Sequence, residues 1–377
     1  MTKEDRIKKI IHEAARELNG IMTVTPTQAA KDVVKKAMGR SVRSKDPMFW
    51  PAGMLMLGLA EAAAWCENKA ASGDEAGTDE KYVQVRDAIL HAVTAHMSLW
   101  KNRYQESLDF VDDALAGVAF VRLYKITKDM KYKEAADRIA DFLDKAPRDF
   151  EGAVIYNGSR SRNIFVDGTG QVSMFYAAYS SISEGYAEYL DKAVEQLVIF
   201  SKFGMDRKSG LNYHGYELRD AAVEGFGCEK KGLLGWGRAF GWLLLGLSET
   251  CVELSKKVGP NGALIQWYRQ LAALAVEYQR EDGGFSWQIQ AVEGHIDMSA
   301  TGMIAYALER GISAGILDEV EDCREAVLKA RHSMYEHSSK GIVTEALSSC
   351  DDFSVHYQTY GNYPWGQGAV LMALTGE

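Results

Sequence analysis

Three aspartates stand in settings that could support acid–base chemistry. Asp112 and Asp113 are paired at the start of an apolar segment, where aspartates most often cap a helix and interact favourably with its dipole. Asp113 is the better candidate for the cap, which leaves Asp112 able to point elsewhere. Asp167 stands between an apolar stretch and a glycine-rich turn. It too could be a cap, but a carboxyl group flanked by aromatic side chains can have its pKa raised and donate a proton.

Two further segments carry side chains suited to ligand contact. His214 lies in a short extended segment with Tyr213 and Tyr216 around it. A lone histidine is usually a surface or satisfied core residue, but this setting favours a ligand contact or a proton relay. Trp365 opens a predicted helix within Tyr363–Ala369, and Asp297–Met303 opens another. Both of these helix starts could equally be explained by capping and packing.

The segment Gly235–Trp242 concentrates binding chemistry in eight residues. Its glycines allow a ligand to approach the backbone closely, and Trp236 and Trp242 supply flat faces. Arg238 supplies a planar fork of donors for a carboxylate or phosphate. Together they predict a site for an acidic, ring-shaped molecule. The alternative is a helix start with core aromatics and an arginine that extends to water.

Apolar residues recur at three- and four-residue spacing through most of the chain, which predicts about a dozen helices. With only six prolines, three of them before residue 52, most of the chain is free to be helical. The predicted helices cover residues 7–20, 27–38, 52–68, 82–99, 113–127, 130–145, 171–180, 186–203, 237–257, 262–280, 298–311, 319–337 and 365–374. Residues 70–80 lack large apolar side chains and are predicted to form a surface loop.

Short extended pieces follow glycine-containing turns between several of these helices. They are Asp149–Tyr156, Asp206–Tyr213, Asp282–Trp287 and Lys340–Thr344. Helix pairs joined by similar ribbons predict an all-α toroid of helical hairpins with the ribbons on one rim, and a short solenoid is the alternative. We expect residues 1–377 to form one domain.

Composition narrows the function classes. The 43 basic and 52 acidic residues give a net charge of −9, which argues against binding nucleic acid through overall electrostatic attraction. The five cysteines are widely spaced with no Cys-x-x-Cys pair, so neither a zinc site nor a redox motif is indicated, and a reducing compartment is expected. No segment approaches a membrane span. These features predict a cytoplasmic protein, or a periplasmic one if an export signal has been removed.

The ordered motifs resemble the unsaturated glucuronyl and unsaturated rhamnogalacturonyl hydrolases, and are closer to the rhamnogalacturonyl branch. In chain order they are Asp112-Asp113, Leu123-Tyr124, Lys131-Tyr132, Val166-Asp167-Gly168, Tyr213-His214-Gly215, Trp236-Gly237-Arg238, Gly241-Trp242, Ser299-Ala300-Thr301 and Pro364-Trp365-Gly366-Gln367-Gly368. The resemblance implies an (α/α)6 barrel that takes oligosaccharides ending in a C4–C5 unsaturated uronic acid. It also implies hydration of that double bond, after which the ring opens and the sugar leaves as a keto acid, without a metal or organic cofactor.

The resemblance also implies roles for individual residues. Asp167 would be the general acid and base, and Asp112, or Asp113, would be the second carboxylate. His214 and Arg238 would contact the substrate's carboxylate or hydroxyl groups. The aromatic residues of the substrate site would be Trp236, Trp242, Phe165 and Trp365.

Two departures from the family pattern bear on the substrate. Phe165 stands where tryptophan is common, so an indole N–H donor is missing. Ala239-Phe240 replace a glycine-asparagine pair, which makes the expected pocket less polar. The sequence therefore predicts a glycoside hydrolase for a small acidic oligosaccharide and leaves the oligomeric state open. The alternatives are another (α/α)6 sugar enzyme, such as an epimerase or a saturated-glycan hydrolase, and a non-catalytic carbohydrate-binding protein.

Overall fold

The computed structural model describes residues 2–24, 33, 46–72, 80–156, 162–219, 227–259, 261–350 and 358–376. Its α-helices are α1 (Lys3–Gly20), α3 (Trp50–Ala71), α4 (Glu80–Tyr104), α5 (Ala114–Thr127), α6 (Met130–Asp144), α7 (Val166–Ser180), α8 (Tyr186–Phe203), α10 (Gly237–Val258), α11 (Ala263–Glu277), α12 (Met298–Ser313), α13 (Cys323–Glu336) and α14 (Pro364–Thr375). Each corresponds to a predicted helix. The helix predicted over 27–38, and most of the loop predicted over 70–80, lie outside the described residues.

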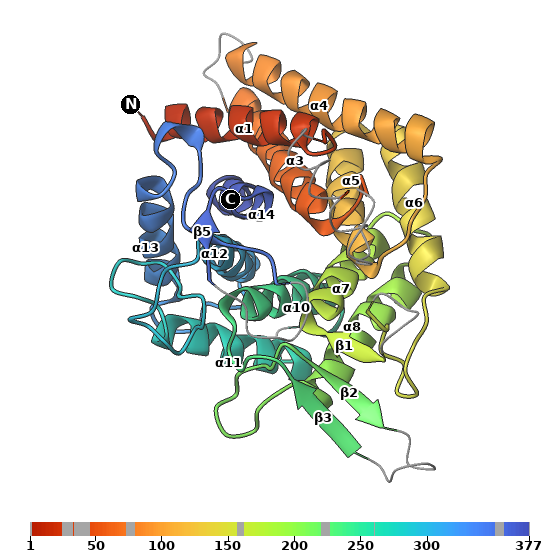
Figure 1. The fold of residues 1–377 in the computed structure, drawn as a ribbon, viewed down its shortest axis with the longest axis vertical. Helices are drawn as coiled ribbons and strands as arrows, with labels where there is room; N and C mark the ends of the chain where they lie inside the picture. The colour runs from red at the N-terminus through yellow and green to blue at the C-terminus, as the bar shows by residue number, and fades with distance from the viewer. Residues whose placement is uncertain are drawn as a thin grey trace.

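Six of the described helices form a closed inner ring. Around it, α3 packs on α5, α5 on α7, α7 on α10, α10 on α12, α12 on α14, and α14 again on α3. Each inner helix packs most extensively on one outer helix, and these are α4, α6, α8, α11, α13 and α1 in the same order. Figure 1 shows this double ring, with α1 and α13 at the closure and the β2–β3 hairpin projecting from the outside. The architecture is the predicted (α/α)6 barrel.

The two rings differ in how their helices are buried. The inner helix α7 is buried all round, whereas the outer helices α1 and α6 bury apolar residues on one face. Inner helices approach closely where glycine removes a side chain. A Cβ on Gly170 of α7 would lie 2.2 Å from the carbonyl oxygen of Trp242 on α10, so this contact requires glycine. Among the described residues, no helix is both long and apolar enough to cross a membrane.

The regular strands lie beside the predicted ribbons rather than within them. β1 (Asn163–Phe165), β2 (Gly215–Arg219) and β3 (Gly227–Lys231) form an antiparallel sheet in that order, and β4 (Ala346–Leu347) pairs with β5 (Tyr360–Gly361). The first three ribbons form only single bridges, Arg148↔Val154, Met205↔Asn212 and Ser286↔Ile296, because each turn closes after one pair. The fourth begins in a 3-10 helix, Ser339–Gly341.

A buried ionic network links four inner helices. Glu249 on α10 has no exposed surface, and its Oε2 lies 2.5 Å from Nη2 of Arg122 on α5 and 3.3 Å from Nη2 of Arg310 on α12. Arg122 also donates from Nε to Oε1 of Glu61 on α3, at 2.9 Å. The same Glu61 oxygen accepts the hydroxyl of Tyr306 at 2.7 Å. Charges buried in this way are tolerated because each is paired.

Candidate active site

Several chemical residues expected from sequence, joined by Trp50, lie at one end of the barrel, where the inner helices begin. They lie at or near the first residues of their helices: Trp50 (α3), Asp112 (before α5), Asp167 (α7), Arg238 (α10), Asp297 (before α12) and Trp365 (α14). The six inner-helix N-termini therefore share this end, and each carries a partial positive charge from its backbone dipole. Such an end favours an anionic ligand.

Asp167 is placed by the strand and helix on either side of it. Helix α7 begins at Val166, earlier than the predicted residue 171, so Asp167 lies in its first turn and is not a cap. The N-cap position is taken by Phe165, whose extended backbone belongs to β1. Every residue of α7 is buried except Asp167. The helix therefore presents one carboxylate at the end of the barrel.

His214 contacts this carboxylate directly. Its backbone carbonyl accepts the N–H of Val166 at 2.9 Å, and Phe165 pairs with Gly215 in the β1–β2 ladder. These contacts bring Nε2 of His214 to 3.1 Å from Oδ2 of Asp167. The imidazole is buried, with 4% of its residue surface exposed. An acid and a base in this contact can hold or move a proton between them.

The two neighbouring aspartates have different surroundings. Asp113 occupies the expected N-cap position of α5, but its side chain makes no capping hydrogen bond to that helix. Its Oδ2 instead accepts the backbone N–H groups of Asp109 and Phe110, at 3.1 and 3.3 Å, just before the 3-10 helix Val111–Asp113. Burial, together with the nearby Asp46 carboxylate, raises the pKa of Asp113 well above its usual value. Asp112 instead accepts the Tyr156 hydroxyl at 2.5 Å on its Oδ2.

Asp112 is also tied to the helix that carries Asp167. Nε2 of Gln171 lies 3.4 Å from Oδ1 of Asp112, and Gln171 is four residues after Asp167 on α7. Residues four apart lie on the same face of a helix. Asp112 and Asp167 are thus held against one face of α7, and Asp112 is the better candidate for the second carboxylate.

An unbroken series of aromatic contacts joins the two acids. The ring of Tyr156 lies 4.5 Å from that of Phe165, which lies 5.0 Å from the imidazole of His214. His214 in turn lies 4.6 Å from Trp236, centroid to centroid. Phe165 therefore supplies an aromatic surface between the acids, as expected.

Arg238 is buried among three indoles instead of presenting an open fork. Its guanidinium carbon lies 4.6 Å from the ring centroid of Trp236, 5.7 Å from Trp365 and 5.9 Å from Trp50. Its Nη1 and Nη2 donate to the carbonyl oxygens of Leu347 and Ser348, at 2.9 and 3.0 Å. Only 1% of its residue surface is exposed. This geometry favours a positioning role for Arg238 over direct contact with the substrate.

Burial lowers the pKa of Arg238, while the charges of Asp297 and Asp167 oppose that shift. The same Leu347 carbonyl also accepts Nε1 of Trp365 at 2.8 Å, and the Leu347 N–H donates to Asp297 at 3.0 Å. Asp297 is the N-cap of α12, and its side chain accepts the Ser299 N–H. Capping was one of the two explanations allowed by the sequence for this helix start. The positive charge of Arg238 therefore attracts two carboxylates, Asp297 before α12 and Asp167 in the first turn of α7.

Trp242 is buried behind the tryptophans that surround Arg238. It is 1% exposed and its ring lies 6.3 Å from that of Trp50, so it packs beneath the aromatic cluster. Ala239 and Phe240 have no exposed surface. Both side chains are packed around α10, so they do not form part of the exposed surface of the site.

Three contributors were missed by the sequence reasoning. They are Tyr156, Gln171 and Trp50. Tyr156 ends the first predicted ribbon, and Trp50 precedes the proline that opens α3. Both are aromatic residues at the edge of a predicted element, which is the signal that could have identified them. Gln171 had no such signal, because it lies inside α7. Within the described part of the chain, no cluster of three or more histidine, cysteine, aspartate or glutamate side chains has metal-binding geometry.

Comparison with known proteins identifies the family of the chain that carries this site. Residues 21–376 match Glycosyl Hydrolase Family 88, which is nearly the whole chain. The chain belongs to glycosyl hydrolase family 88. It is therefore a glycoside hydrolase.

Relatives of this family 88 member include both branches expected from its motifs. The chain is 24% identical over 360 residues to the unsaturated rhamnogalacturonyl hydrolase YesR of Bacillus subtilis (strain 168), covering 91% of this chain and 93% of YesR. A crystal structure of a possible GH105 member from Klebsiella pneumoniae superposes with a TM-score of 0.75 at 16% identity, over 99% of this chain and 92% of that one. The unsaturated glucuronyl hydrolase of Bacillus sp. GL1 gives 0.67 at 16% identity, over 99% and 96%.

Proposed function

We propose that this family 88 enzyme releases the unsaturated uronic acid from the non-reducing end of oligosaccharides left by polysaccharide lyases. Rhamnogalacturonan-type substrates from pectin are preferred in this proposal, because the sequence relative YesR is named as an unsaturated rhamnogalacturonyl hydrolase. The observation that carries the proposal is the buried His214 imidazole 3.1 Å from the Asp167 carboxylate at the anion-favouring end of the barrel.

The reaction begins with a proton transfer to carbon. The C4–C5 double bond of the unsaturated uronic acid is an enol ether, because C5 carries the ring oxygen, and it is electron-rich at C4. Asp167 donates its proton to C4, and positive charge develops at C5 and the ring oxygen. A water molecule then adds to C5 while Asp167, now a carboxylate, accepts a proton from that water. The product of this step is a hemiketal, and Asp167 ends in its starting state.

The hemiketal then collapses without a further catalyst. Its C5–O5 bond breaks to leave a ketone at C5, and O5 becomes a hydroxyl group on C1. C1 now carries both this hydroxyl and the remaining oligosaccharide, so it is a hemiacetal. It opens to an aldehyde and releases the oligosaccharide as an alcohol. The sugar leaves as a keto acid, and one water has been consumed.

The other residues act on this step from fixed positions. His214 holds Asp167 in place and can exchange a proton with it. Asp112, which is fully buried and fixed by Tyr156 and Gln171, is the second carboxylate near the same sugar. Trp236 and Phe165 offer aromatic faces for the flattened ring. This use of the acids differs from ordinary glycosidases, in which two carboxylates flank the glycosidic bond itself.

Isotope labelling tests the reaction. Rhamnogalacturonan- and glycosaminoglycan-derived unsaturated disaccharides would be incubated with the protein in D₂O, and early products examined by NMR. Hydration predicts one deuterium at C4 and a ring-opened keto acid. Cleavage with the double bond intact and no deuterium at C4 would instead support an ordinary glycosidase. Saturable binding without turnover of either substrate would support the carbohydrate-binding alternative.

The compartment proposed for this reaction is the cytoplasm. Cys66, Cys228, Cys251 and Cys323 are free thiols, and Cys228 is exposed. Free thiols are maintained in a reducing compartment.

A further inference from the structure

A separate cavity lies at the opposite end of the barrel, where α3 and α14 finish. It has a volume of about 350 Å³ and is bounded by α1, α3, α13 and α14. Trp65 lines it from α3, fifteen residues after Trp50 of the candidate active site. That spacing corresponds to about 20 Å along the helix. The cavity is therefore distinct from the site at the helix starts.

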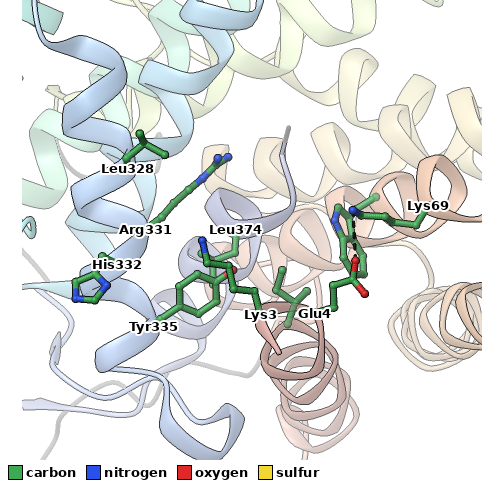
Figure 2. A pocket seen from close by; sticks show the side chains of 10 residues that line it. Lys3, Glu4, Lys69, Leu328, Arg331, His332, Tyr335 and Leu374 are labelled. Atoms are coloured by element: carbon green, nitrogen blue, oxygen red, sulfur yellow. Dashed lines mark ion pairs between the residues drawn. The ribbon is translucent and has the colours of Figure 1, made fainter. Parts of the chain in front are cut away.

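Basic side chains dominate the charge of this cavity. Lys3, Lys69 and Arg331 line it, and Glu4 is the carboxylate among its lining residues. Glu4 is already occupied: Lys69 lies 3.4 Å from its Oε1, and the hydroxyl of Tyr82 donates to its Oε2 at 2.5 Å and lowers the pKa of the carboxyl group. Figure 2 shows Lys3 of α1 beside Tyr335 of α13, with Arg331 above them, whereas Glu4 of α1 points away from Tyr335 toward Lys69, with which it forms an ion pair. The cavity keeps a net positive charge.

Arg331 also has an acidic neighbour outside the cavity. Its Nη2 lies 3.5 Å from Oε2 of Glu309, which is longer than the roughly 2.7–2.9 Å of a strong charge-assisted hydrogen bond. Lys3, in contrast, is an exposed side chain in the first turn of α1. The attraction for an anion therefore comes most directly from Lys3, with Lys69 and Arg331 adding to it.

Flat and apolar surfaces complete the lining. The ammonium of Lys3 lies 6.0 Å from the ring centroid of Tyr335, and that of Lys69 lies 5.9 Å from the ring centroid of Trp65. Ile7 and Leu374 are buried residues at the same cavity. The lining therefore combines two aromatic rings that have ammonium groups over them with apolar side chains, which suits a small ring that carries an anionic group.

We propose that this cavity is a second, non-catalytic binding site for a carboxylate of monosaccharide size, of the uronate class. The volume is at the small end of the roughly 300–1,000 Å³ of ligand sites, which suits one sugar ring. The choice of a uronate rests on the proposed function, since the reaction handles uronic acids and releases a sugar acid. Inorganic phosphate shares the negative charge but has no ring to use the aromatic faces.

Calorimetric titration of the full chain tests this site. D-galacturonate is the probe, galactose the neutral control and inorganic phosphate the ringless anion. The variants are the double substitution Lys3→Ala/Lys69→Ala and, as a matched control, Lys101→Ala, an exposed lysine on α4 outside the cavity. We expect a saturable galacturonate site that is weakened about tenfold or more in the double variant, because its charge-assisted contacts are lost. Lys101→Ala should bind as the wild type does.

Several results would overturn the proposal. They are no saturable galacturonate binding, equal affinity in the double variant and the wild type, equal binding of galactose, or displacement of galacturonate by lower concentrations of phosphate. Turnover of unsaturated disaccharides is measured separately and should be unchanged in both variants. Galacturonate has no C4–C5 double bond and is not a substrate for hydration. The binding result can therefore be interpreted even if the proposed reaction is not observed.

Discussion

Nε2 of His214 lies 3.1 Å from Oδ2 of Asp167, although the two side chains come from different elements. The β1–β2 ladder and the hydrogen bond from the Val166 N–H to the His214 carbonyl fix this approach. The contact is therefore a product of the backbone, and the imidazole can hold the carboxylate in one orientation. Asp167 is the residue that acts on the substrate in our account, and His214 positions it.

Replacing the imidazole should slow the reaction more than it weakens binding. For His214→Ala we expect kcat to fall about ten- to a hundredfold, because Asp167 loses the imidazole that holds its carboxylate at 3.1 Å. KM should change much less, because the residue acts through Asp167. Steady-state kinetics on the unsaturated disaccharide give both numbers. A rise in KM with unchanged kcat would make His214 a binding residue instead.

The short bond between Tyr156 and Asp112 gives a second prediction. Tyr156→Phe removes the hydroxyl that donates to Oδ2 of Asp112 at 2.5 Å but keeps the ring beside Phe165. We expect kcat/KM to fall about tenfold or more, because a hydrogen bond to a carboxylate is lost. Tyr216→Phe is the matched control, since this buried hydroxyl has no hydrogen-bond partner among the described residues. Equal effects of the two substitutions would argue against a special role for Tyr156.

Arg238 should be intolerant even of lysine. Arg238→Lys keeps the charge but cannot donate to the Leu347 and Ser348 carbonyls together while stacking on Trp236. We expect the free energy of unfolding to fall by about 1–3 kcal/mol and activity to fall with it. Urea unfolding and kinetics measure the two effects. Full stability with lost activity would show that the arginine contacts substrate directly.

The buried network at Glu249 predicts a pH-dependent stability. Burial opposes ionisation, but Arg122 and Arg310 outweigh it and lower the pKa of Glu249 from 4.5 to about 2. A carboxyl group with a lowered folded-state pKa stabilises the fold above pH 4.5, and this contribution is lost as the pH falls towards 2. Glu249→Gln should therefore cost about 3–5 kcal/mol at neutral pH, since Arg310 loses its carboxylate partner and Arg122 is left with Glu61 alone.

The same variant shows whether the negative charge of Glu249 is responsible for this stabilisation. Urea unfolding of wild type and Glu249→Gln across pH 2–7 should give a stability difference that narrows between pH 4.5 and 2. A difference that stays constant over this range would assign the effect to packing, not to ionisation.

The fold was predictable because inner and outer helices both carry strong apolar patterns. Periodicity located α1 through Ile7, Ile10 and Ile11, and it located α10, which is buried over most of its length, through its leucines. The start of α7 was missed because Gly168 and Gly170 read as a turn. In the structure they are helical, and Gly170 is needed for the contact with Trp242. The close approach of two helices depends on tertiary packing, which cannot be inferred from the spacing of residues along the sequence.

The site was predictable in its residue types but not in its geometry. The N-cap position of Asp113 followed from its place before α5, but its hydrogen bonds to the preceding N–H groups of Asp109 and Phe110 did not. The burial of Arg238 did not, because its partners are the carbonyls of Leu347 and Ser348, more than a hundred residues away. Tyr156 was overlooked because its function depends on a contact with Asp112 made across the barrel end.

The central claim is that Asp167 protonates the double bond, and Asp167→Asn tests it most directly. The substitution keeps the size and position of the side chain but removes the acid. Loss of the double-bond absorbance of a lyase-generated disaccharide would be followed in wild type and variant, with unfolding curves as the control. We predict that kcat falls by at least about a hundredfold, and up to about ten-thousandfold, while stability is retained. A folded variant whose kcat stays within about tenfold of the wild type would contradict the account.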